Sequence, residues 1–506
     1  MADQIAPTDT TAQARDANRT LNTPHIVGLI VGAATPLAVL VGTIPLGLAL
    51  GGPSLGLTFL AAGLVVLLFI VGYVKMAQRI SRPGAFYNYI SRGLGRPIGV
   101  GAAMIAALAY PLGLIGAFAI NAVLIQGMIQ QLFGVTIAWQ ILLLISVAVV
   151  GTLSYLGIDL SAGIVFIIVI IEVTVVTILI ISIIVSKGAG AFPIEALSPH
   201  VLTVGQVSVA FIFAFLCYQG FEAGAMYSPE AKNPSRTVPR ALYAAVIVVT
   251  ATFFLATWAL TSTTGIEGMQ AKVAEIGIGG FVFATVSDYL GPFGLFIFSV
   301  GTLMSILAIE ISIVNFMSRY LRTLAAEDLL PRYLARSNRF RSPGAAIITL
   351  LALALVVIFG ASLIGLDPLT QVSSVAFGIG ALCSTVLMLT ASIAVIAYFQ
   401  RLPRSERNLW TTLIAPAIAS VLLLGALIVQ ITGFSYITGS QEGWTGFLPW
   451  VVLIVLVSGI GFGVWIRRFR PRTYQDLAAG DSAEEAAALR EIRVQAHAEE
   501  KAARRS

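Results

Sequence analysis

Twelve apolar stretches, each long enough to cross a bilayer as a helix, run through this sequence of 506 residues. About 20 apolar residues in a helix match the thickness of the hydrocarbon core. Charged residues make up only 11% of the chain, whereas soluble domains carry about 25%. The sequence therefore predicts an all-α membrane protein with twelve transmembrane helices, at residues 26–50, 55–79, 98–132, 137–155, 161–185, 205–226, 238–262, 291–318, 344–362, 371–399, 411–433 and 447–467.

The basic residues predict how these helices are oriented. An even number of spans places both ends of the chain on the same side of the membrane. If the N-terminus is inside, only Lys187 and Lys272 of the 30 lysines and arginines fall outside, as the positive-inside rule expects. We therefore predict a multi-pass plasma-membrane protein with two cytoplasmic tails, residues 1–23 and 471–506.

Several classes of function find no support in the sequence. Cys217 and Cys383 lie in separate apolar runs, and none of the three histidines lies near a second histidine or a cysteine, so we expect neither a disulfide scaffold nor a metal site. Catalytic triads and phosphate-binding loops are also missing, so we expect no enzymatic activity and no cofactor. The net charge of +6 follows from membrane topology, so we expect no nucleic-acid partner.

Two predicted spans are interrupted near their middle. Pro36 should open the first span near residues 32–36, because proline lacks an N–H and clashes with the preceding turn. The sixth span carries Tyr218-Gln219-Gly220-Phe221-Glu222 at bilayer depth. A proline kink alone is common in membrane helices, but paired interruptions in two halves of a chain are typical of a transporter binding site. Freed N–H groups at such a break suit a carboxylate, and freed carbonyls suit an ammonium group or a cation.

Three groups of residues resemble motifs of the amino acid–polyamine–organocation (APC) superfamily. Phe-x-x-Tyr-x-Gly-Phe-Glu begins at Phe215, and Glu-x-Lys-Asn-Pro-x-Arg-x-x-Pro begins at Glu230. Arg-Pro-Gly-Ala-Phe-Tyr-x-Tyr at residues 82–89, followed by Gly-Leu-Gly at 93–95, is similar to the element after the second span. Arg-Tyr-Leu-Arg at 319–322, continuing to Pro331, is similar to the loop after the eighth span.

This resemblance implies a leucine-transporter-type fold, in which two inverted five-helix repeats precede two extra helices. The repeats would occupy residues 24–200 and 201–400, and the extra helices residues 401–470. It also implies transport of amino acids or amines. The first span departs from the family pattern, since Pro36-Leu37-Ala38 stands where members usually have Gly-x-Gly.

Three acidic residues fall inside predicted spans, namely Glu172, Glu222 and Glu310. A charged carboxylate costs a few kcal/mol at the centre of a membrane helix, so each should face the interior of the bundle. Burial favours the neutral form, which lets such a group take up a proton. Glu172 lies roughly where proton-coupled members of the resembled family often have a lysine. It is our candidate for proton coupling, with Glu310 as a second group sharing the proton. Each acid also has a structural alternative. Glu172 could form a hydrogen bond at the break of the first helix, and Glu222 could cap the break of the sixth helix. The hydrogen-bond partners of Glu310 could be Ser305, Ser312 or Asn315.

Aromatic side chains complete the candidate site, and one of them should close over the substrate. Asn121 and Tyr110 in the third span are further candidates for its lining. The residues expected to bind substrate are Gly32, Ala33, Ala34, Thr35, Pro36, Leu37, Ala38, Tyr110, Phe215, Tyr218, Gly220, Phe221 and Glu222.

The sequence thus predicts a secondary active transporter of amino acids or related amines, with proton symport by alternating access as the favoured mechanism. Exchange of two amino compounds and a sensor without transport are the alternatives, whereas a channel is disfavoured by the paired breaks. Outside the spans, we expect an amphipathic outer helix within residues 265–288 and a solvated helical tail at 473–506.

Overall fold

The computed structural model describes residues 21–80, 85–157, 162–191, 193–198, 204–227, 231–340, 342–438 and 443–471, together with Tyr474 and Leu477. The long helices, with the segments that continue them, are α2 (Thr23–Ala34), α3 (Pro36–Ala38), η1 (Val39–Thr43), α4 (Ile44–Gly51), α5 (Leu55–Arg79), α6 (Ala85–Leu94), α7 (Arg96–Phe133), α8 (Trp139–Tyr155), α9 (Ala162–Lys187), α10 (Val204–Leu216), α11 (Ala223–Met226), α12 (Pro234–Thr264), α13 (Met269–Ile276), α14 (Ile278–Ala326), α15 (Gly344–Leu363), η7 (Pro368–Ser373), α16 (Ser374–Gln400), η9 (Trp410–Ile414), α17 (Ala415–Thr432) and α18 (Leu448–Phe469).

These helices confirm the prediction of an all-α membrane protein. Within the described ranges, ten helical segments are long and apolar enough to cross a membrane. Two shorter apolar helices, Trp139–Tyr155 and Gln206–Leu216, lie at the positions expected for the fourth and sixth spans. The second of these is short because the chain leaves the helix at the expected interruption. The twelve-span, five-plus-five arrangement itself stays a prediction.

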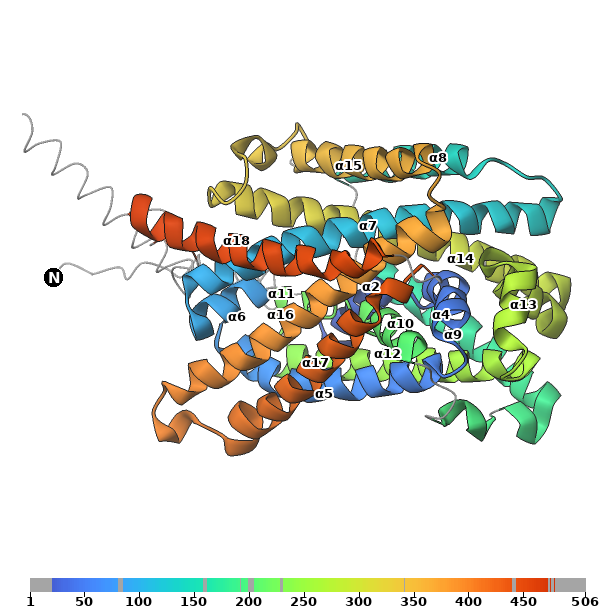
Figure 1. Cartoon of the computed structure of the whole chain (residues 1–506), viewed down its shortest axis with the longest axis horizontal. Helices are drawn as coiled ribbons and strands as arrows, with labels where there is room; N and C mark the ends of the chain where they lie inside the picture. Colours follow the sequence, from blue (N-terminus) through green and yellow to red (C-terminus); the bar gives the residue numbers. More distant parts are fainter. Residues whose placement is uncertain are drawn as a thin grey trace, which may run out of the picture.

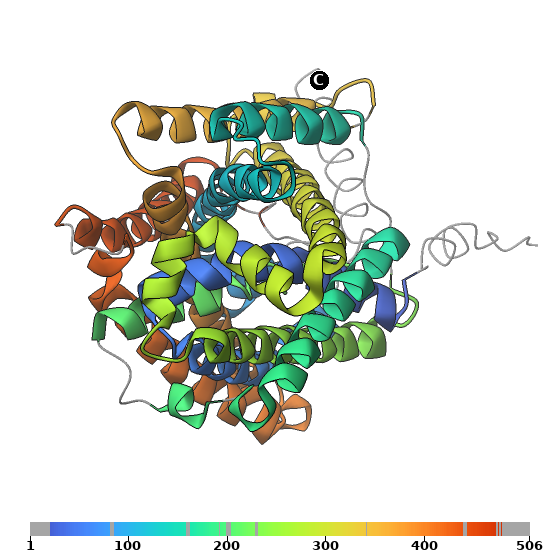
Figure 2. The same cartoon turned by 90° about the vertical axis from the view of Figure 1, so that its right-hand side faces the viewer.

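The helices form one elongated bundle whose two ends differ in composition. Figure 1 shows α6 and the basic connection from α16 to α17 at one end and α13 at the opposite end. The end with α13 carries the segments predicted to lie outside the cell. The side chain of Gln270 in α13 donates a hydrogen bond of 2.9 Å to the carbonyl of Ala49, which ties α13 to α4. Viewed from that end, α13 and the start of α14 cross over the bundle (Figure 2).

The predicted outer helix proves to be two elements. α13 is a short helix, and the remainder of the segment forms the first part of α14. α14 turns sharply at Gly291, whose φ of 67° and ψ of −174° are not helical, immediately before Pro292. The sharp turn explains why the apolar pattern of the eighth span begins at residue 291.

The start of the C-terminal tail packs on the bundle. The guanidinium of Arg96 donates a hydrogen bond of 2.6 Å to the carbonyl of Leu477 and lies 5.3 Å from the ring centre of Tyr474. Leu477 is buried among residues of α6, α7 and α18. This part of the predicted solvated tail is therefore held against the protein, and the remainder of the tail lies outside the described residues.

The most extensive helix pair joins α18 to α7, which lie side by side in Figure 1. A Cβ atom added to Gly459 of α18 would lie 2.8 Å from the Cα of Gly101 in α7. Close approach through small residues is how membrane helices gain packing energy, because lipid tails are as apolar as the side chains. Gly461 lies two residues further along the same helix and has nothing within 4 Å of its added Cβ.

We expect Gly459→Ala to destabilise the protein, because the new methyl group has no room against α7. Overpacking of this kind costs about 1–3 kcal/mol, so the melting temperature of the purified protein in detergent should fall by several degrees. Gly461→Ala should leave it unchanged. Equal melting temperatures for the two variants would show that α18 does not pack on α7 in this register.

Candidate functional site

The first transmembrane helix is broken at Thr35. This residue ends α2 with φ 39° and ψ 76°, a left-handed conformation that β-branched residues rarely adopt. Pro36 then starts α3. Residues held in such conformations cost of order 1–3 kcal/mol and cluster at functional sites. The interruption thus falls within the predicted segment of residues 32–36, at Thr35 rather than at Gly32.

Side chains from two other helices bind the backbone beyond this break. The N–H of Ala38 donates a hydrogen bond of 3.3 Å to the hydroxyl of Ser305 in α14. The carboxyl group of Glu172 in α9 interacts with the N–H of Leu37 and with the same hydroxyl. In an unbroken helix these two N–H groups would bond the carbonyls of Ala33 and Ala34. The break therefore leaves those carbonyls without their usual helical partners, while its N–H groups are already engaged.

The sixth transmembrane helix is broken between α10 and α11. Gly220 adopts a φ of 101°, which is accessible to glycine and strained for other residues. Its N–H donates a hydrogen bond of 3.0 Å to Oε2 of Glu222, and the Tyr110 hydroxyl of α7 donates one to Oε1. Glu222 is buried, and its carboxylate links the backbone at the break to the Tyr110 hydroxyl through hydrogen bonds. Glu222 makes no capping hydrogen bond to the first turn of α11 and binds the turn before it instead, so its predicted capping role stays a prediction.

The two breaks lie next to each other. A Cβ atom built on Gly220 would lie 3.5 Å from the Cβ of Ala33 in the first helix. One turn later, a Cβ on Gly224 would touch the side chain of Ile30. Two interruptions far apart in sequence therefore meet inside the bundle, as expected for a shared site.

The three aromatic candidates of the sixth helix have different surroundings. The Tyr218 hydroxyl lies 3.0 Å from the carbonyl of Phe59 in α5 and 2.8 Å from the hydroxyl of Thr250 in α12, so it joins three helices. Phe215 is fully buried, with its ring 6.3 Å from that of Phe211. Phe221 is the one that lies at the break beside an aromatic cluster.

That aromatic cluster comprises Phe221 and three rings from α5 and α6. The ring centre of Phe221 lies 5.9 Å from those of Phe69 and Tyr73 and 6.3 Å from that of Phe86. All four side chains are buried. The cluster lies on the α6 side of the break, toward the end of the bundle that carries the basic connections.

Glu310 has two partners from other helices. The amide of Asn121 in α7 donates to its Oε1 at 3.0 Å, and the hydroxyl of Ser146 in α8 donates to its Oε2 at 2.5 Å. The expected local partners on α14 are not the ones used, and Asn121 binds Glu310 rather than standing free as a pocket liner. The partners of Glu310 and Glu172 do not overlap, so a proton shared between them stays a prediction.

Four polar atoms around the two breaks are buried and have no hydrogen-bond partner within the part of the chain that the structure describes. They are Oγ1 of Thr35, Nε2 of Gln219, Oε2 of Glu172 and the hydroxyl of Tyr73. Thr35 and Glu172 are only 1% and 2% exposed. Buried polar groups without partners are rare in proteins, and each calls for an explanation such as a missing ligand.

Gln219 is the residue that sequence reasoning missed. Its side-chain oxygen lies 3.6 Å from a Cβ built on Gly113 of α7 and 3.7 Å from one built on Gly380 of α16. The amide group thus extends from the break toward two further helices. The signal was present, since a glutamine at bilayer depth is costly unless it has a polar partner.

Comparison with known proteins agrees with this architecture. The sequence model of the family described as amino acid permease matches residues 21–458. The branched-chain amino acid permease BcaP of Lactococcus lactis subsp. cremoris (strain MG1363) is 26% identical over 373 residues, which cover 67% of this chain and 75% of that protein. An uncharacterized protein of Methanocaldococcus jannaschii is 23% identical over 356 residues, covering 69% of this chain and 77% of its own length.

The family match extends over most of the chain and includes both broken helices and all three motifs that resemble the APC superfamily. The protein therefore belongs to the amino acid permease family of the APC superfamily, and it is a multi-pass membrane transporter of amino acids rather than an enzyme.

Proposed function

We propose that this protein is a secondary active transporter that carries amino acids or related amines across the plasma membrane by alternating access, as a proton symporter. The observation that carries the proposal is the meeting of two helix breaks at Gly220 and Ala33. Because one relative is named a branched-chain amino acid permease, amino acids with apolar side chains are the first substrates to test.

The unpartnered polar atoms suggest how the substrate is held. The hydroxyl of Thr35 and the side-chain amide of Gln219 are hydrogen-bond donors and suit the α-carboxylate. The carbonyls of Ala33 and Ala34 are acceptors and suit the α-ammonium group. The carboxylate would then be bound by side chains rather than by the N–H groups of the first break, which Glu172 and Ser305 already occupy.

The contacts of Glu172 support a role in coupling a proton to the geometry of the first helix. As a carboxylate, it accepts hydrogen bonds from groups that border the break, and its second oxygen has no partner. Protonation would remove the charge that holds the Leu37 N–H and so weaken the interaction that fixes α3. Uptake and release of one proton would then switch the first helix between two states, one in which Glu172 holds α3 and one in which it does not.

The coupling role predicts the behaviour of Glu172→Gln in proteoliposomes. An inward proton gradient should drive accumulation of labelled leucine, isoleucine or valine by the wild type, because transport consumes the gradient. The variant should lose this accumulation and keep exchange of internal for external substrate. Glu275→Gln, an exposed change on α13, should behave as the wild type.

Four outcomes would revise the proposal. Undiminished accumulation in Glu172→Gln would return Glu172 to a purely structural role. Exchange without any net uptake in the wild type would identify an antiporter. No transport across a panel of neutral, acidic and basic amino acids and polyamines would leave the sensor alternative. An equal loss in Glu310→Gln would show that Glu310 shares the proton.

The binding role of Thr35 predicts a selective rise in KM. Thr35→Val keeps the shape and removes the hydroxyl, so the substrate loses one hydrogen bond. A loss of about 1.4 kcal/mol corresponds to a tenfold weaker affinity, and we expect KM for uptake to rise by about that factor. Gln219→Leu should have a similar effect.

Thr257→Val is the matched control, because Thr257 is also buried, with an unpartnered hydroxyl, but lies against α5 in α12. Its KM should remain that of the wild type. If Thr35→Val and Thr257→Val changed KM equally, the hydroxyl of Thr35 would not contact the substrate.

A further inference from the structure

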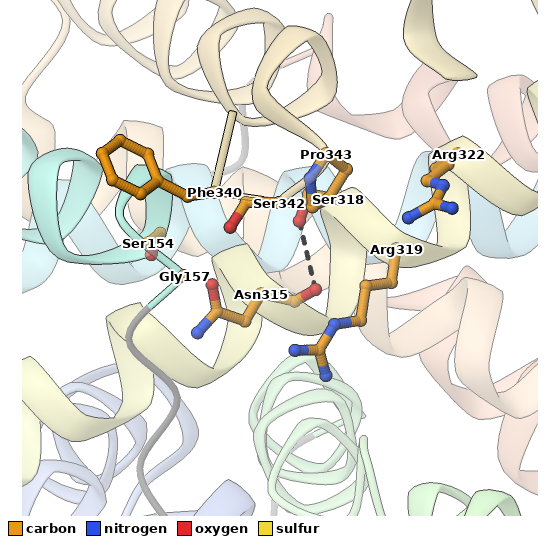
Figure 3. A pocket seen from close by; sticks show the side chains of 9 residues that line it. All are labelled: Ser154, Gly157, Asn315, Ser318, Arg319, Arg322, Phe340, Ser342 and Pro343. Carbon is orange, nitrogen blue, oxygen red and sulfur yellow. Dashed lines mark hydrogen bonds between the residues drawn. The ribbon is translucent and has the colours of Figure 1, made fainter. Parts of the chain in front are cut away.

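A cavity lies away from the two breaks, at the end of the bundle with the basic connections. Its volume is about 230 Å³. Its walls come from the end of α8, from α14 and from the chain leading into α15 (Figure 3). None of the residues discussed for amino acid binding lines it. The cavity therefore has no role in the transport mechanism described above.

The lining of this cavity is basic and rich in hydrogen-bond donors. Two arginines of α14, Arg319 and Arg322, line it one turn apart, and none of its described lining residues is acidic. Both arginines are exposed, so their guanidinium groups can be reached from outside the protein.

Ser154 gives the cavity a buried donor that lacks a partner. The residue is 1% exposed, and its Oγ makes no hydrogen bond with any part of the chain that the structure describes. Ser342, from the chain that leads into α15, also lines the cavity (Figure 3). A hydroxyl sealed inside a protein without a partner is costly, and a ligand oxygen would satisfy it.

The start of α15 adds a positive electrostatic potential. This 20-residue helix begins at Gly344, directly after the lining residues Ser342 and Pro343. The first turn of a helix presents unsatisfied N–H groups and the positive end of the helix dipole, which together attract anions. Two arginines, a buried hydroxyl and the residues just before a helix thus border one cavity, and they come from three elements.

We propose that this cavity is a binding site for a phosphate group, carried either by an anionic phospholipid headgroup or by a soluble phosphate. A tetrahedral phosphate has enough oxygens to accept from several donors at once, and arginine binds it with two parallel hydrogen bonds. Because the cavity joins α8, α14 and α15, the bound anion stabilises this junction of the bundle.

Thermal unfolding of the full-length purified protein in a neutral detergent tests the site. The probes are dihexanoyl phosphatidylglycerol, dihexanoyl phosphatidylcholine and inorganic phosphate. We expect a saturable rise of the melting temperature with an anionic probe. In Arg322→Gln the midpoint of this titration should move to at least tenfold higher concentration, and Arg322→Lys should recover part of the loss because it keeps the charge. Arg401→Gln, an exposed arginine outside the cavity, should titrate as the wild type.

The probes separate the two possible sources of the phosphate. Saturation by phosphatidylglycerol alone identifies a lipid headgroup, whereas saturation by inorganic phosphate at similar concentration identifies a soluble ligand. The proposal is overturned if neither anion gives a saturable shift, if phosphatidylcholine is as effective as phosphatidylglycerol, or if Arg322→Gln and Arg401→Gln titrate alike.

Discussion

The structure depends on one constraint, that a backbone polar group inside hydrocarbon must find a partner within the protein. An unsatisfied N–H or carbonyl there costs several kcal/mol, so a membrane helix can be interrupted only where other groups replace its lost hydrogen bonds. At both breaks, carboxylates take part in binding the freed N–H groups. Glu222 receives the N–H of Gly220 at one break, and Glu172 and Ser305 receive the N–H groups beyond Thr35 at the other. The buried acids are therefore part of the architecture as well as candidates for chemistry.

These replacements connect helices that are distant in sequence. Glu222 joins the sixth membrane helix to α7 through Tyr110, and Ser305 joins the first helix to α14. Glu310 ties α14 to α7 and α8 through Asn121 and Ser146. Any movement of a broken helix must therefore exchange polar partners with these neighbours. Transport on this scaffold is a rearrangement of specific hydrogen bonds and not only a sliding of apolar surfaces.

Much of the fold could be predicted because hydrophobic length and proline chemistry are local properties. Pro36 led to a predicted break within residues 32–36, which contain the observed break at Thr35, and Gly220 marked the second break. The partners of the breaks could not be predicted, because they depend on which faces of α9 and α14 turn inward. Ser305 was one of three residues named as possible local partners of Glu310, yet its hydroxyl accepts a hydrogen bond from the N–H of Ala38 in the first membrane helix. Gln219 could not be assigned to the site for the same reason, because its role depends on its side chain extending toward α7 and α16.

The aromatic cluster beneath the second break has a kinetic consequence. Phe221 contacts three rings at once, and aromatic pairs contribute about 0.5–1.5 kcal/mol each beyond their burial. A path from the site that passes this point must separate these rings together, which slows opening by roughly one to three orders of magnitude. One of the rings, Phe86, belongs to α6, a short helix between two membrane spans. A transport path that ran past Phe221 would therefore give this connecting segment, which contains no residue proposed to bind substrate, a share in setting the speed of the cycle.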